Sequence, residues 1–119
     1  MNVDHAVITE LLELGRKGED RVPPALADPE SAWSFLQRDP ALWEEAGREL
    51  PEEQLRLLIR GLVHYSRARG PVAIGLSVSP VISLFSSYSE RFRDERHSLT
   101  KWIVANRVNP YEPFGSFDW

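Results

Sequence analysis

Apolar residues recur every three or four positions along most of the chain, which is the spacing that places them on one face of an α-helix. The strongest pattern covers residues 51–69 and follows the helix-start signal Leu50-Pro51-Glu52-Glu53. Its apolar stripe comprises Leu55, Leu58, Ile59, Leu62 and Val63. Residues 4–14 repeat this spacing, and Gly15 and Gly18 are expected to end that helix. We therefore predict a long central helix and a shorter N-terminal one.

Two Asp-Pro pairs indicate short helices over residues 31–37 and 41–48, because aspartate caps a helix and proline fits its first turn. Large apolar side chains are expected to anchor this pair to the core: Trp33, Leu36, Leu42 and Trp43. Residues 16–27, with adjacent prolines and mixed charge, predict an exposed connection between the first helix and this pair.

Apolar positions keep a helical phase over residues 80–106, but Glu95 would then lie in the middle of the buried stripe. Burial of an unpaired carboxylate is costly, so we predict two helices, 80–92 and 97–106. Residues 71–79 alternate apolar with small residues, which is typical of a half-buried strand. No second strand is evident, so an extended connector on the core is favoured over pairing with its copy in a dimer.

Residues 107–119 contain two prolines, which exclude a regular helix, and four aromatic side chains. These aromatic residues are Tyr111, Phe114, Phe117 and Trp119. They complete the core of their own chain or contact another chain, and both alternatives predict burial. The expected fold is one all-α domain over residues 1–119. It is a compact bundle of about five or six helices, with an extended segment near 71–79 and this irregular, aromatic-rich tail.

The composition narrows the function classes. The 119 residues contain no cysteine, which excludes disulfides, thiolate zinc sites and thiol catalysis. The sequence opens without the basic and apolar regions of a signal peptide, and no stretch approaches the ~18 apolar residues of a membrane span. We therefore expect a cytoplasmic protein without membrane contact.

The net charge of −4 conceals an uneven distribution. Residues 1–54 carry 5 basic and 13 acidic side chains, whereas residues 55–119 carry 9 basic and 5 acidic ones, so the halves have charges of −8 and +4. This polarity favours a charged partner or head-to-tail association of copies, although the halves also neutralise one another within one fold.

Arginines are the most informative polar residues, and four of them lie on the predicted central helix or at its end: Arg56, Arg60, Arg67 and Arg69. The first three share a broad side that can bind phosphate or a carboxylate-rich surface. A pI of about 5.4 argues against strong binding of nucleic acid, which depends on accumulated positive charge. The four arginines and the four tail aromatics are the predicted interaction residues.

Motifs for catalysis or metal binding are weak. His64 and His97 both project opposite the apolar stripes and are expected to be solvated. Glu90 and Asp94 would share a side with His97 on a continuous helix, but neighbouring arginines oppose cation binding. Ser98-Leu99-Thr100-Lys101 matches the S-x-x-K pattern of penicillin-interacting serine enzymes without their companion motifs. We expect no catalytic residue, metal or cofactor.

These observations favour a small helical interaction protein, expected as a homodimer, that presents a charged and aromatic surface to a protein partner. An adaptor role or a bacterial immunity or antitoxin-like role suits its size, because an acidic face can block a basic toxin. The alternative is an enzyme or binder of a small anionic ligand, with an arginine-lined pocket and His64 or His97 as proton donor. Weak nucleic-acid binding is a third hypothesis.

Overall fold

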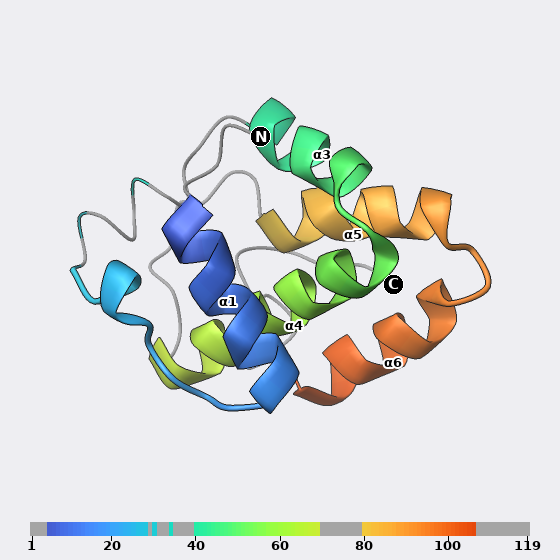
Figure 1. Cartoon of the computed structure of the whole chain (residues 1–119). Coiled ribbons are helices and arrows are strands. Elements are labelled where there is room, and N and C mark those ends of the chain that lie inside the picture. Colours follow the sequence, from blue (N-terminus) through green and yellow to red (C-terminus); the bar gives the residue numbers. More distant parts are fainter. Residues whose placement is uncertain (1–4, 29, 31–33, 35–39, 70–79, 107–119) are drawn as a thin grey trace.

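The computed structural model describes residues 5–28, 30, 34, 40–69 and 80–106. Within these ranges it contains no strand, and its regular elements are helical (Figure 1). They are α1 (His5–Lys17), the 3₁₀ turn η1 (Pro24–Leu26), α3 (Pro40–Glu49), α4 (Glu52–Arg69), α5 (Pro80–Arg91) and α6 (Arg96–Asn106). The all-α fold class is confirmed, and none of these helices is long and apolar enough to cross a membrane.

Three predicted segments fall outside the described residues, wholly or almost so. They are the short helix over 31–37, the extended segment over 71–79 and the tail over 107–119. The tail carries the predicted interaction residues Tyr111, Phe114, Phe117 and Trp119. The predictions for these segments remain predictions.

Helix α4 is the centre of the bundle, because α1, α5 and α6 all pack against it (Figure 1). The apolar stripe predicted for this helix is fully buried: Leu55, Leu58, Ile59, Leu62 and Val63. Burial extends beyond the stripe, since His64, Tyr65 and Ser66 are also buried. With neighbours on several sides, residues 61–66 of α4 are all buried.

Helices α1 and α4 cross with their backbones in direct contact. A Cβ atom on Gly15 would clash with the Leu57 carbonyl, and one on Gly61 would clash with the Leu11 carbonyl. The prediction that the first helix ends at Leu14 is therefore wrong, because Gly15 is a packing position inside α1. Gly18 ends the helix, as predicted, with a φ of +67° and its amide 2.9 Å from the carbonyl of Leu14.

The connection after α1 is not exposed throughout, which corrects the prediction for residues 16–27. Leu26 in η1 belongs to the core, and Pro23 before it is buried as well. The amide of Ala25 donates a hydrogen bond of 3.2 Å to the carboxylate of Glu10 on α1. The connection is thus held against the helix that precedes it.

Helix α3 packs on α5 through a small residue on each helix. The backbone at Gly47 lies so close to Ser87 that an added Cβ would meet its side chain at 2.7 Å. Arg91 at the end of α5 donates hydrogen bonds to the carbonyls of Gly47, at 2.5 Å, and Leu50, at 2.7 Å. Both carbonyls lie at the C-terminal end of α3, where the last carbonyls of a helix generally lack an intrahelical partner, so Arg91 caps this end.

The predicted break between the last two helices is confirmed. The chain leaves α5 after Arg91, and the amides of Glu95 and Arg96 both donate to the carbonyl of Phe92, at 3.1 and 3.0 Å. Glu95 lies exposed in this turn, while Leu99 of α6 remains buried. The turn therefore keeps the carboxylate in water without exposing the apolar face that follows it.

Candidate functional site

His64 lies in a polar junction on the second half of α4. Its Nδ1 donates a hydrogen bond of 2.7 Å to Asp20, whose other carboxylate oxygen accepts one of 2.9 Å from Arg67 Nε. Arg67 also donates to the carbonyl of Asn106 at the end of α6, at 3.0 Å. The hydrogen bond from His64, together with Arg67, lowers the pKa of Asp20 below its usual value. The junction thus joins α4 to the connection after α1 and to α6.

The prediction that His64 is solvated is wrong, because only 7% of it is exposed. Asp20 provides the hydrogen-bond partner that allows the imidazole to be buried, and Trp102 of α6 packs edge-on against the ring at a centroid distance of 5.4 Å. His97 is exposed, as predicted. The S-x-x-K residue Ser98 lies in the first turn of α6 and is also exposed.

The structure brings together two of the predicted arginines, Arg56 and Arg60, in a cavity of about 180 Å³. The cavity lies among α4, α5 and the start of α6, and its other lining residues are Glu52, Tyr88, Asp94, Glu95, Ser98 and Leu99. We call it the arginine cavity, and no histidine is among these lining residues. Arg67 belongs to the junction at His64 instead, and Arg69 is the last residue of α4.

The two guanidinium groups of the arginine cavity differ in whether a carboxylate neutralises their charge. Glu52 accepts a hydrogen bond of 2.8 Å from Tyr88 and lies 3.5 Å from Nε of Arg56. Burial, with the adjacent Glu52 carboxylate, raises the pKa of Tyr88 far above its ordinary value. Arg60 has no ion pair among the described residues, and its guanidinium lies 4.9 Å from the centre of the Trp102 ring.

Both arginines have lost part of their hydration. Nε of Arg56 and Nε of Arg60 are buried without a hydrogen-bond partner in the described part of the chain. Burial, and secondarily the charge of Arg56, lowers the pKa of Arg60. Because the ionised form of Arg60 is disfavoured where it stands, an acceptor brought into the cavity would stabilise it.

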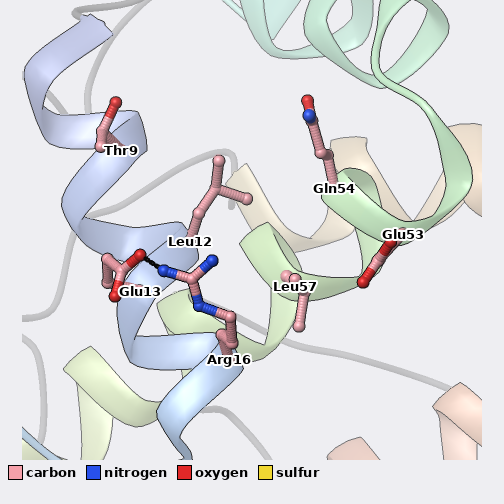
Figure 2. Close-up of a pocket in the computed structure, with 7 residues that line it drawn as sticks. All are labelled: Thr9, Leu12, Glu13, Arg16, Glu53, Gln54 and Leu57. Atoms are coloured by element: carbon pink, nitrogen blue, oxygen red, sulfur yellow. Dashed lines mark ion pairs between the residues drawn. The ribbon is translucent and has the colours of Figure 1, made fainter.

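A larger pocket, of about 350 Å³, lies between α1 and α4 (Figure 2). Figure 2 shows Leu12 and Leu57 between the polar side chains of the two helices. The complete lining is Thr9, Leu12, Glu13 and Arg16 of α1 with Glu53, Gln54 and Leu57 of α4. We call this pocket the leucine groove, because its two leucines form an apolar floor within a polar rim.

The rim of the leucine groove has one acid that is paired and one that is not. Glu13 forms an ion pair with Arg16, one turn along the same helix (Figure 2). Glu53 is exposed and has no ion pair among the described residues. Sequence reasoning missed this groove, although two apolar residues outside the predicted stripes gave a signal. Leu57 lies outside the stripe of the central helix. Leu12 lies outside that of the N-terminal helix, which consists of Val7, Ile8, Leu11 and Leu14.

Metal binding has no support in the part of the chain that the structure describes, where no group of three His, Asp or Glu residues could hold an ion. The turn after α5 interrupts the continuous helix that would align Glu90, Asp94 and His97.

Comparison with known proteins gives no family: no family model matches the chain, and no curated protein or solved structure is significantly similar to it.

Proposed function

We propose that this chain is a small helical protein-binding module, and that its leucine groove receives a basic segment of a partner protein. The observation that carries the proposal is the lining of the groove, in which Leu12 and Leu57 lie between glutamates of two different helices. The segment would insert one apolar side chain between the leucines and place a lysine or arginine beside Glu53.

The apolar floor of the groove supplies the favourable free energy of binding. Leu12 and Leu57 are only partly buried, so a partner that covers them removes apolar surface from water, at roughly 25 cal/mol per Å². A volume of about 350 Å³ corresponds to about twelve water molecules, which is room for one or two side chains. An apolar anchor inside a polar rim is the arrangement found at the centre of many protein interfaces.

Charge selects the class of partner. Glu53 has no ion pair within the described residues, and the half of the chain that contributes most of the groove lining has a charge of −8. A basic segment would gain an ion pair with Glu53 and would be steered toward the acidic half before contact. This mode of binding suits the immunity or antitoxin-like role, in which an acidic protein covers a basic surface. The absence of cysteine is in keeping with the proposed action in the cytoplasm.

Selection from a random peptide display library tests the proposal, with the pure full chain as bait. We expect the enriched peptides to contain an apolar residue flanked by lysine or arginine. When these peptides bind, the amide chemical shifts of the protein should change at Leu12, Leu57 and Glu53. Light scattering of the pure chain tests the homodimer that is expected from the sequence.

Matched variants make the test specific to the groove. Leu57→Gln and Glu53→Lys should each weaken the selected peptides by about tenfold or more, a difference of about 1.4 kcal/mol. Val104→Gln is the control, because Val104 is an apolar residue on α6 with 45% exposure and lies outside the groove. Enrichment of peptides without basic residues, or equal affinity for wild type and Glu53→Lys, would contradict the proposal.

A further inference from the structure

The arginine cavity has a lining of both signs, and this makes it a different kind of site from the leucine groove. Its cations, Arg56 and Arg60, come from α4, whereas Asp94 and Glu95 come from the exposed turn before α6. Glu52 is already engaged by Tyr88 and Arg56. Within the described residues, Arg60, Asp94 and Glu95 are left without an ion pair.

The arginines of the cavity are suited to bind a carboxylate, and Arg60 is the one without a carboxylate partner in the described part of the chain. Its guanidinium packs against Trp102, and Arg60 lines the cavity without an ion pair in the described residues. A guanidinium presents its N–H groups in a planar fork that matches a carboxylate. A second arginine, Arg56, stands one helical turn before it in the same lining, so a carboxylate here would meet two cations.

The charge count excludes a simple anion as the best occupant. Three carboxylates and two guanidinium groups line the cavity, so a phosphate or another dianion would be repelled by the lining as a whole. A molecule that carries one carboxylate and one ammonium group adds no net charge. Such a molecule can place its carboxylate at the arginines and its ammonium group at Asp94 and Glu95.

The size of the cavity limits the occupant. Its volume of about 180 Å³ equals the share of about six water molecules in the liquid, which suits a molecule of amino-acid size and is too small for a nucleotide. From the paired signs and this volume, we infer that the arginine cavity binds a free α-amino acid. Arg56 and Arg60 hold its carboxylate, and Asp94 and Glu95 face its ammonium group. The inference does not depend on the leucine groove.

Titration of the full chain with the common amino acids, one at a time, followed by amide chemical shifts, tests this inference. We expect at least one of them to bind in the millimolar range or tighter and to shift residues of the cavity, Ser98 and Leu99 among them. For the tightest binder, the analogue without the amino group and the analogue without the carboxylate should each bind about tenfold more weakly or worse. Shifts confined to other surfaces, or no binding by any amino acid, would overturn the inference.

Variants separate the two ends of the ligand. Arg60→Gln should abolish binding of the amino acid, whereas the double variant Asp94→Asn, Glu95→Gln should remove only its preference over the analogue without the amino group. Arg93→Gln is the matched control, because Arg93 is exposed in the same turn and does not line the cavity. If Arg60→Gln fails to fold, as judged by its circular dichroism and melting, the double variant still decides. An unchanged preference in that variant would refute the role of the turn.

Discussion

The leucine groove and the arginine cavity lie on different faces of one helix and depart from ordinary surface chemistry in opposite ways. Glu53 and Leu57 of α4 line the groove, while Glu52 and Arg56, their immediate neighbours in the sequence, line the cavity. Successive residues of a helix point about 100° apart, so adjacent positions can serve separate sites. The groove leaves apolar side chains partly in water, whereas the cavity takes charged side chains partly out of it. Both arrangements become more stable when a complementary ligand arrives.

Different interactions also hold in place the helices that form each site. The groove depends on backbone contact between α1 and α4 at Gly15 and Gly61, where no side chain fits. At the cavity, a hydrogen bond between polar side chains joins Tyr88 of α5 to Glu52 of α4. Mutations that damage one site should therefore leave the other largely intact, and this separation can be tested.

The largest effect is expected from Gly61→Ala. Alanine has the higher helix propensity, by up to about 1 kcal/mol, but its Cβ would clash with the Leu11 carbonyl. The backbone of α1 would have to move, so we expect a loss of about 3 kcal/mol in the free energy of unfolding, measured with urea. Amide shifts should change along α1 and the groove, and much less at Ser98 and Leu99, which line the cavity from α6.

Gly18→Ala is the control for this experiment. Nothing lies within 4 Å of the added Cβ, so its cost comes only from the φ of +67° and should be about 1 kcal/mol. Equal losses for the two glycine variants would show that close packing of α1 on α4 is not what holds the groove.

A smaller effect, on the cavity side, is expected from Tyr88→Phe. The variant loses the hydrogen bond to Glu52, which is partly exposed and still has Arg56 beside it, so we expect a cost of about 1 kcal/mol at neutral pH. The groove should keep its affinity for basic peptides, because Tyr88 does not line it.

The pH dependence gives this variant a second readout. The pKa of Tyr88 is raised on folding from an ordinary value of 10.0, so above pH 10 the unfolded chain loses this proton while the folded chain keeps it. In wild type, the contribution of Tyr88 to the free energy of unfolding should therefore be fully present below pH 10 and should be lost as the pH rises further. Tyr88→Phe lacks this contribution, so its stability should fall less steeply. Parallel curves in urea unfolding above pH 10 would show that Tyr88 is not the buried, hydrogen-bonded phenol of the cavity.

Much of this architecture was predictable, because local signals and packing agree. The stripe of α4 was predicted residue by residue, and Glu95 marked the break between α5 and α6 since a carboxylate does not remain in a buried stripe. The end of α1 was missed for a physical reason. Gly15 has the appearance of a helix terminator, but its role comes from the backbone of α4, which no local pattern of α1 reveals.

The sites were less predictable, because they depend on partners distant in the sequence. His64 lies on the polar side of α4, yet it is buried because Asp20, 44 residues earlier, provides its hydrogen bond. The spacing of Arg56 and Arg60 correctly placed them on one side of a helix, but nothing in the sequence connected them to Glu95. Leu12 and Leu57 were apolar residues outside the stripes, and their meeting in one groove required the crossing of α1 and α4.

The smallest effect, and the one that compares both sites in a single experiment, is the response to salt. Raising NaCl from about 0.1 M to about 1 M shortens the screening length from about 10 Å to about 3 Å. Peptides selected on the groove carry a net positive charge and meet the exposed Glu53, so their affinity should fall by about threefold. An amino acid in the arginine cavity has no net charge and meets the partly desolvated Arg60, so its affinity should change by less than about twofold. Titration of both ligands at each salt concentration measures the difference directly. An equal loss at both sites would mean that the arginines are as well hydrated as Glu53, and the contrast between the two faces of α4 would then be wrong.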